Sequence, residues 1–360
     1  MGAITEKKTA EARRKILRLI LDESLARGRK LPSCEELCTR FGLGASTVFA
    51  ALKTLCDEGV LRSRNKVGVF VDDLRPGLFG YRVALLINGP VIPPFPVTLT
   101  YFIQAECLRK GCEVTFFSGS YRGDDSDRED VFEVMPGLKR MFDLRLIDGI
   151  ITLVSLSESN LRTFEEAGIP VCFAGGFLDR QSGEGAPALC RYRSSIPAES
   201  FFRQGGRRMK ELGAKRPVLL WPSDTHFSSE RFFREECGGK TVKGEKWTDI
   251  FPIVERMLRM PRSEWPDAML IPDDLVAQRL YANLAMKAGT AGLPHPVILA
   301  EAEIPVFLPV PTDRLEIRLK DLAGKAVDVL KSAMRNPEPE VCIEAFTEPE
   351  LHVADRDSFC

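Results

Sequence analysis

The 360-residue sequence lacks the features that mark several common classes of protein. It has only three histidines, and its ten cysteines are scattered with no CxxC pair, so neither a zinc site nor a disulfide framework is indicated. No run approaches the ~18 uncharged apolar residues of a membrane-spanning helix, and the charge-rich N-terminus is unlike a secretory leader. We expect a cytoplasmic protein with no metal, no membrane contact and reduced, mostly buried thiols. Redox sensing is the less favoured role of the thiols.

The short motifs that bind nucleotides or activate nucleophiles are also missing. The sequence has no GxGxxG after a strand, no GxxxxGK[ST] loop, no GxSxG elbow and no HExxH helix. An acidic loop at Asp124, Asp125 and Asp127 is explained as well by solvation as by chemistry. We therefore predict no catalytic residues and no cofactor, and we keep an enzyme built on the larger C-terminal part as an alternative.

The composition, with 44% apolar and 28% charged residues, is that of a soluble globular protein. At ~150 residues per domain, the length suggests about two to three domains. The net charge of −1 conceals an asymmetry, since residues 1–75 have 15 Lys and Arg against 10 Asp and Glu, and the remainder has 35 against 41. A basic head favours a polyanionic partner, because each phosphate that it neutralises releases condensed counterions. A merely solvated basic surface explains the charge equally well.

Residues 1–72 have the pattern of three helices followed by a hairpin. A second helix starts at a capping box formed by Ser33 and Glu36, and a third is expected over residues 45–57. Residues 60–62 and 69–71 then alternate like two short strands. This order is typical of a winged helix-turn-helix, in which the third helix enters a DNA major groove and a basic wing contacts phosphates.

Residues 31–71 resemble the winged-helix domain of GntR-type transcription regulators. The resemblance rests on Leu31-Pro32-Ser33, Glu36-Leu37, Gly42, Thr47-Val48, Ala51-Leu52, Leu55, Glu58-Gly59 and Gly68. It implies a DNA-binding domain over residues 1–72 and a double-stranded DNA operator as partner. A winged helix that docks on another protein, with no DNA target, is the alternative.

The sequence departs from this family at positions that read DNA. The family usually has arginines where Glu35, Ala45 and Phe49 stand here, and a glycine in place of Lys66. Ala45 and Phe49 suit contact with thymine methyl groups, and the neighbouring polar and cationic residues suit contact with the backbone. The DNA-binding set that we predict is Ser33, Ala45, Ser46, Thr47, Phe49, Lys53, Arg62, Arg64 and Lys66. We expect an unusual operator sequence or a modest affinity.

Residues 73–80 are polar and contain proline and glycine, which predicts a linker. Strand-length apolar runs follow, most of them separated by helix-length segments, at residues 82–87, 113–117, 149–154, 170–174, 217–221, 268–271 and 297–300. This alternation favours βαβ units and parallel sheets covered on both faces. Residues 81–360 are also numerous enough for two lobes.

Residues 81–358 resemble the effector-binding domain of the LacI/GalR family, which is built like a periplasmic sugar-binding protein. The match rests on the order and spacing of residues 81–87, 147–151, 167–171, 206–213, 265–274 and 350–358. It implies an α/β body at residues 81–360, with two lobes, parallel sheets and a role in dimerisation. The pairing of domains resembles that of arabinose-responsive repressors. We therefore expect a homodimer whose effector is a small polar molecule, a sugar or sugar derivative.

In two-lobed α/β proteins, ligands bind beyond the carboxyl ends of the strands. The ligand-binding set that we predict on this basis is Asn88, Phe95, Asp224, His226, Arg231, Asp273 and Glu301. Several of these residues have a simpler alternative: Asp273 or Asp274 as the cap of the next helix, Phe95 as loop packing, and Arg231 as the partner of Glu235. His226 is favoured as a polar loop residue over a proton carrier.

The function we predict is a DNA-binding transcription regulator, expected to be a repressor, controlled by a ligand in the cleft between the lobes. Closure of the cleft would rotate the lobes and change the spacing of two heads in a dimer. An extracytoplasmic solute-binding protein is disfavoured, because a basic N-terminal domain would have no function in such a protein.

Overall fold

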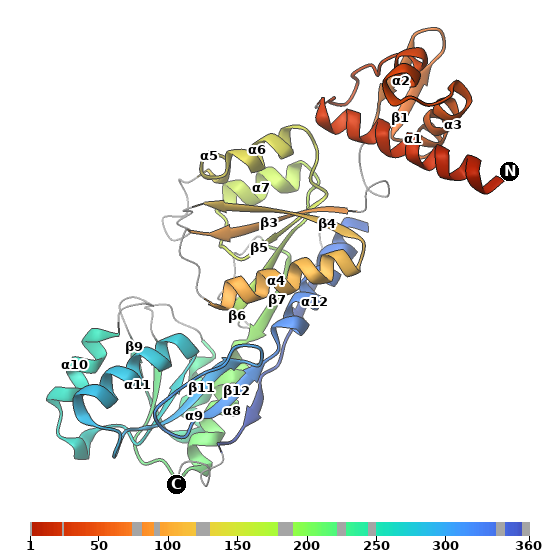
Figure 1. Cartoon of the computed structure of the whole chain (residues 1–360). Helices are drawn as coiled ribbons and strands as arrows, with labels where there is room; N and C mark the ends of the chain where they lie inside the picture. The colour runs from red at the N-terminus through yellow and green to blue at the C-terminus, as the bar shows by residue number, and fades with distance from the viewer. Residues whose placement is uncertain are drawn as a thin grey trace.

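The computed structural model describes residues 2–23, 25–73, 81–89, 94–119, 130–178, 190–221, 228–243, 250–335 and 343–354. Figure 1 shows a small helical head followed by two α/β lobes. None of the helices in these ranges combines the length and apolarity needed to cross a membrane.

The head contains three helices and a two-stranded antiparallel wing. Its elements are α1 Gly2–Asp22, α2 Cys34–Phe41, α3 Ala45–Asp57, β1 Leu61–Arg64 and β2 Gly68–Val71. The predicted capping box begins α2, where the Ser33 hydroxyl accepts from the Glu36 N–H at 3.2 Å and Glu36 Oε2 accepts from the Ser33 N–H at 2.6 Å. One apolar core joins these elements, and α3 contributes Val48, Ala51, Leu52 and Leu55 to it. The opposite face of α3 is therefore free to bind another molecule.

The N-lobe is a six-stranded parallel sheet in the order β13-β7-β6-β5-β3-β4. The strands are β3 Tyr81–Asn88, β4 Cys112–Gly119, β5 Gly149–Thr152, β6 Val171–Leu178, β7 Tyr192–Pro197 and β13 Ile343–Phe346. Helices α4 Pro94–Arg109 and α12 Leu319–Arg335 cover one face. Helices α5 Val131–Val134, α6 Pro136–Asp143 and α7 Glu158–Glu166 cover the other.

The C-lobe has a second six-stranded sheet in the order β14-β12-β11-β10-β8-β9, parallel except for β14. Its strands are β8 Pro217–Trp221, β9 Lys240–Lys243, β10 Ala268–Ile271, β11 His295–Glu301, β12 Asp313–Ile317 and β14 Glu350–His352. Helices α8 Ala198–Glu211 and α9 Glu230–Cys237 cover one face. Helices α10 Phe251–Arg259 and α11 Asp274–Ala288 cover the other, beside the 3₁₀ turn Arg262–Glu264. The predicted α/β body with parallel sheets is confirmed.

The described chain passes between the two sheets at three places: from β7 to α8, from β12 to α12 and from β13 to β14. Hydrogen bonds join these crossings. The Ser194 hydroxyl donates to the Leu322 carbonyl at 2.9 Å, and Lys325 Nζ donates to the Phe346 carbonyl at 2.7 Å. Three neighbouring connections between two sheets are the arrangement of a hinge, about which lobes can rotate as rigid units.

A buried ion-pair network holds the far end of the C-lobe. Asp313, at the start of β12, accepts from Arg208 Nε at 2.7 Å and lies 2.9 Å from His295 Nε2. Its other oxygen accepts from the Ala354 N–H at 2.8 Å. Burial opposes ionisation of Asp313, but the hydrogen bonds from His295 and Arg208 outweigh it and lower the pKa to about 2.

We predict that Asp313→Asn lowers the free energy of unfolding by about 3 kcal/mol at pH 7, because it leaves Arg208 without its buried partner. The folded pKa of Asp313 lies below the unfolded value of about 3.9, so this stabilisation is present above about pH 4 and is lost as the pH falls toward 2. Urea unfolding from pH 7 to pH 3 measures it. The difference between wild type and variant should shrink over that range, and a constant difference would contradict the assignment.

Candidate DNA interface and ligand cleft

The outer face of α3 carries the predicted DNA-contacting residues, and they are exposed. Ala45, Ser46, Phe49 and Lys53 all point away from the core of the head. Phe49 is 65% exposed in the middle of the helix. Its size and flatness suit contact with the thymine methyl groups of a major groove.

The wing places cationic side chains beside this helix. Strand β1, which packs against α3, exposes Arg62 and Arg64, and the guanidinium of Arg64 lies 5.0 Å from the centre of the Phe70 ring. Lys66 occupies the turn between β1 and β2 with φ of 62°, in the left-handed region. That conformation costs a non-glycine residue roughly 1–2 kcal/mol.

Two members of the predicted DNA-binding set are less available. Ser33 is exposed, but its hydroxyl is engaged in the cap of α2, and Thr47 is half-buried. The structure places the other seven, Ala45, Ser46, Phe49, Lys53, Arg62, Arg64 and Lys66, on exposed positions of one small domain.

The strongest candidate for ligand binding in the C-lobe is a group of carboxylates. Asp273 and Asp274 follow β10, and Glu301 ends the neighbouring parallel strand β11. The carboxyl ends of parallel strands meet at one edge of a sheet, so these side chains lie together there. Asp273 Oδ1 accepts from the Val276 N–H at 2.7 Å, and Asp273 is thus the N-cap of α11, the simpler alternative given above.

Glu301 is only 7% exposed, and its Oε2 atom has no hydrogen-bond partner in the described part of the chain. Burial, followed by the charges of Asp274 and Asp273, raises the pKa of Glu301 to about 8. Burial and the charge of Asp273 raise the pKa of Asp274 to about 6. Glu301 is therefore largely protonated at neutral pH and has hydrogen-bonding capacity to offer a ligand. Sequence reasoning treated Asp274 only as a helix cap, although two successive aspartates after a strand are a visible signal.

The other predicted ligand residues are only partly described. Phe95 is half-buried at the start of α4, and its ring lies against Gly175 of β6, where an added β-carbon would stand 3.4 Å from the ring. Arg231 is exposed on α9, with its guanidinium 4.8 Å from the centre of the Phe232 ring. Asp224, His226 and the side chain of Asn88 lie outside the described residues.

An aromatic cluster, which the sequence did not indicate, joins the lobes. Phe177 lies near the carboxyl end of β6 in the N-lobe, and Trp221 is the last residue of β8 in the C-lobe. The centres of their rings are 5.6 Å apart. Phe201 and Phe202 of α8 complete the group. Because Trp221 is buried between the lobes, its fluorescence is a natural reporter of any change in their relative position.

Comparisons with known proteins agree with both parts of this architecture. Residues 8–71 match the family described as bacterial regulatory proteins, gntR family. No curated protein matches the chain. A solved transcriptional regulator CelR–cellobiose complex is 15% identical with a TM-score of 0.58, covering 91% of this chain and 100% of its own.

Two further solved structures share the fold of the body. The Cra transcriptional dual regulator from Pseudomonas putida, in complex with fructose 1-phosphate, is 12% identical with a TM-score of 0.57 and covers 76% of this chain and 98% of its own. A Lac repressor dimer bound to operator and the anti-inducer ONPF is 14% identical with a TM-score of 0.55 and covers 76% of this chain and 93% of its own. The chain thus joins a winged-helix head, which matches the gntR family of bacterial regulatory proteins over residues 8–71, to a body with the fold of LacI-type transcription regulators.

Proposed function

We propose that this chain is a DNA-binding transcription regulator, acting as a repressor in the cytoplasm, whose operator affinity is controlled by a sugar or sugar derivative bound between the lobes. The observation that carries the proposal is the exposed outer face of α3, with Phe49 at its centre and the cationic wing beside it, in a domain of the gntR family. The predicted DNA-binding set stands as the proposed interface.

The proposed ligand site is the edge of the C-lobe sheet at Asp273, Asp274 and Glu301, with Phe95, Arg231, Asn88, Asp224 and His226 as further contacts. A ligand shifts the balance between open and closed lobes only by its different affinity for the two states. Contacts from both lobes satisfy this requirement, because closure brings them together about the hinge. In a dimer, the rotation changes the spacing of the two heads relative to adjacent half-sites.

An enzyme is the second candidate. Glu301 is a buried carboxyl group with a pKa of about 8, and a raised pKa of this kind is also typical of a catalytic general acid. Besides burial, the charges that raise its pKa belong to other carboxylates, and such a group suits recognition of hydroxyl groups as well as catalysis. We propose the binding role, with no catalytic residues and no cofactor. A sugar that binds the chain and is recovered unchanged after long incubation supports it, and turnover that disappears in Glu301→Gln favours the enzyme.

Selection of bound duplexes from a random-sequence pool by the full chain tests the proposed function. We expect a two-fold symmetric site, as a symmetric dimer requires, with A·T pairs where Phe49 and Ala45 meet thymine methyl groups. Enrichment of no sequence, together with no measurable duplex binding at low salt, would favour the protein-docking alternative.

Dimerisation has a candidate surface on the N-lobe. Val97, Tyr101 and Leu108 form an exposed apolar stripe on α4, the α4 stripe, at 51%, 64% and 62% exposure. It lies beside β4, an edge strand of the described sheet, where Phe116 is also exposed. An apolar helix face next to an unpaired strand edge is typical of a surface that a second copy covers.

The double variant Tyr101→Asp, Leu108→Asp is therefore expected to weaken dimerisation at least about 100-fold, because it buries two charges in the interface. Light scattering over a range of protein concentrations measures the change. Val67→Asp, on the wing, is the control for adding a charge to an exposed apolar site. A double variant that remains dimeric at every concentration would place the interface elsewhere.

A further inference from the structure

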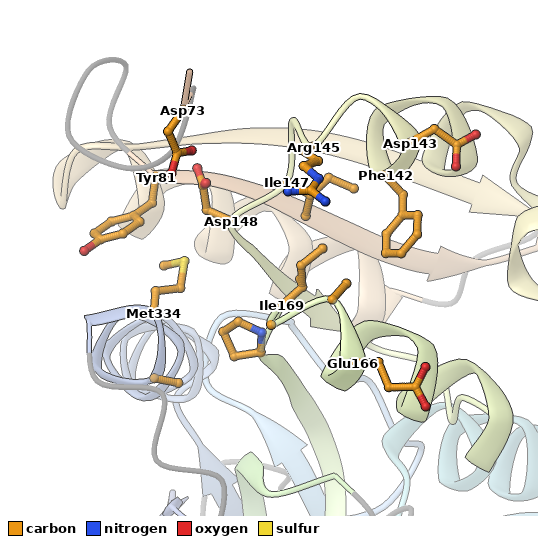
Figure 2. Close-up of a pocket in the computed structure, with 14 residues that line it drawn as sticks. Asp73, Tyr81, Phe142, Asp143, Arg145, Ile147, Asp148, Glu166, Ile169 and Met334 are labelled. Carbon is orange, nitrogen blue, oxygen red and sulfur yellow. The ribbon is translucent and has the colours of Figure 1, made fainter. Parts of the chain in front are cut away.

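A cavity of about 620 Å³ lies at the edge of the N-lobe sheet where β3, β5 and β6 begin (Figure 2). This is the opposite edge from the carboxyl ends of the strands, so the cavity is separate from the ligand site proposed above. Its volume is within the range of small-molecule sites. One lining residue, Asp73, follows the wing strand β2, whereas the others belong to the N-lobe.

The lining combines apolar walls with an excess of negative charge. The rings of Tyr81 and Phe142 and the side chains of Ile147, Ile169 and Met334 form the walls. Its charged members are Asp73, Asp143, Asp148, Glu166 and Arg145, four carboxylates against one guanidinium. Aromatic faces attract a cation through their quadrupole, and carboxylates pair with it directly. This combination suits an organic cation better than an anion or a neutral sugar.

Asp148 supplies an independent sign of a missing partner. Its side chain is 3% exposed, and Oδ2 accepts from the Arg82 N–H at 2.7 Å, with Arg82 Nε 3.6 Å away. Its Oδ1 atom is buried and has no hydrogen-bond partner in the described part of the chain. Figure 2 shows its carboxylate facing that of Asp73. Burial raises the pKa of Asp148, hydrogen bonding to Arg82 opposes this, and the charge of Asp73 adds to the increase.

We propose that this cavity is a second binding site, which takes a protonated amine attached to an apolar body. The ammonium group would lie between Asp148 and Asp73, where it would give Oδ1 of Asp148 a donor and offset the repulsion between the two carboxylates. The apolar body would lie against Tyr81, Ile169 and Met334. A metal ion is a poorer occupant, because no three potential ligands within the described ranges are arranged to hold one.

Occupation of this site would also fix the head relative to the body, since Asp73 ends the described part of the head and Asp148 belongs to the N-lobe. This consequence, unlike binding itself, rests on the proposed DNA-binding function. An amine would then act on DNA affinity in addition to the proposed effector, from the N-lobe, whereas the proposed effector site is at the edge of the C-lobe sheet.

Calorimetric titration of the full chain, without DNA, tests the site with 2-phenylethylamine and its neutral counterpart 2-phenylethanol. We expect the amine to bind at one site per chain and the alcohol to bind at least about 10-fold more weakly. Asp148→Asn should weaken amine binding about 10-fold or more. Asp73→Asn, which removes a carboxylate from the end of the head and not from the core, should weaken it several-fold even if Asp148→Asn fails to fold.

Two control variants test whether the amine binds in this cavity and not at other carboxylates. Glu113→Gln, an exposed acid on β4, and Glu301→Gln, at the end of β11 in the C-lobe, should bind the amine as the wild type does. Absence of amine binding, equal binding of amine and alcohol, or binding that survives both Asp148→Asn and Asp73→Asn would overturn the proposal. Loss of binding in Glu301→Gln alone would place the amine in the cleft and overturn it as well. None of these outcomes depends on whether the chain binds DNA.

Discussion

Glu301→Gln is expected to stabilise the ligand-free protein and at the same time to remove its response to an effector. In the folded chain the pKa of Glu301 is about 8, raised by burial and by the charges of Asp274 and Asp273, whereas an unfolded glutamate has a pKa of about 4.3. The unfolded state therefore gives up this proton at lower pH than the folded state. Glu301 costs the protein stability progressively as the pH rises from about 4.3 to about 8.

Glutamine keeps the shape of the side chain and does not titrate, so the variant avoids this cost. We expect a gain on the order of 3 kcal/mol in the free energy of unfolding at pH 7. Urea unfolding from pH 5 to pH 9 measures it: wild-type stability should fall across this range, and the variant should show only the weaker dependence left by Asp274 below about pH 6. Glu255→Gln, on an exposed turn of α10, should behave as the wild type does.

The same variant should lose ligand binding, because a carboxyl group that gives up its proton when a ligand's hydroxyl groups reach it accepts at both oxygens, whereas an amide has only one acceptor oxygen. A thermal-shift screen of a sugar library against the wild type supplies the ligand, since a molecule that binds only the folded state raises its apparent stability. We expect the selected sugar to bind Glu301→Gln at least about 10-fold more weakly. A variant that is less stable than wild type and still responds to the sugar would show that Glu301 is only part of the core.

Charge reversal at Lys53 and Arg62 is the second change with a large expected effect. The double variant Lys53→Glu, Arg62→Glu should bind a DNA duplex about 100-fold more weakly at moderate salt, because two phosphate contacts are lost and two repulsive charges are added. Both side chains are exposed, one on α3 and one on β1, so the fold of the head should be unaffected. Fluorescence anisotropy of a labelled duplex measures the affinity.

A matched double variant on the C-lobe, Arg259→Glu, Lys287→Glu, changes the net charge equally at exposed positions of α10 and α11. It should reduce duplex affinity only slightly, since the C-lobe lies at the other end of the molecule from the head (Figure 1). An equal loss of duplex affinity in the two double variants would mean that net charge alone governs binding. It would contradict the proposal that α3 and the wing contact the DNA.

The head was predictable nearly residue by residue because its signals are local. The capping box of Ser33 and Glu36 begins α2 as expected, and α3 covers the predicted residues 45–57. Four predicted DNA-contacting residues of α3, namely Ala45, Ser46, Phe49 and Lys53, are exposed. The left-handed conformation of Lys66 was not predicted, because nothing in a lysine residue indicates it and the geometry is imposed by the turn.

The body was predictable where strands are continuously apolar and not where they are polar. All seven predicted strands are present, but β7, with Arg193, Ser194 and Ser195, was missed although all three residues are buried. Their partners come from distant segments: Arg193 contacts Glu344 at 3.0 Å and Ser194 donates to Leu322. A strand that is buried by virtue of such contacts has no apolar pattern of its own. Strands β9, β12, β13 and β14 also went unpredicted.

The candidate sites divide in the same way. The positions of Asp273 and Glu301 at one sheet edge follow from the parallel topology that the sequence predicts, but the burial of Glu301 depends on packing that no local pattern contains. The cavity at the opposite edge was not predicted at all. Its lining comes from separate segments around Asp73, Tyr81, Arg145, Glu166 and Met334, which only the folded chain brings together.

The salt dependence of duplex binding by the full chain most directly tests whether α3 and the wing bind a DNA duplex. If Lys53, Arg62, Arg64 and Lys66 each neutralise one phosphate, the logarithm of the binding constant should fall against the logarithm of salt concentration with a slope of about −3 to −4 per head. The slope should become less steep by about 2 per head in Lys53→Glu, Arg62→Glu. A slope near zero for the wild type would contradict a DNA-binding role for this protein.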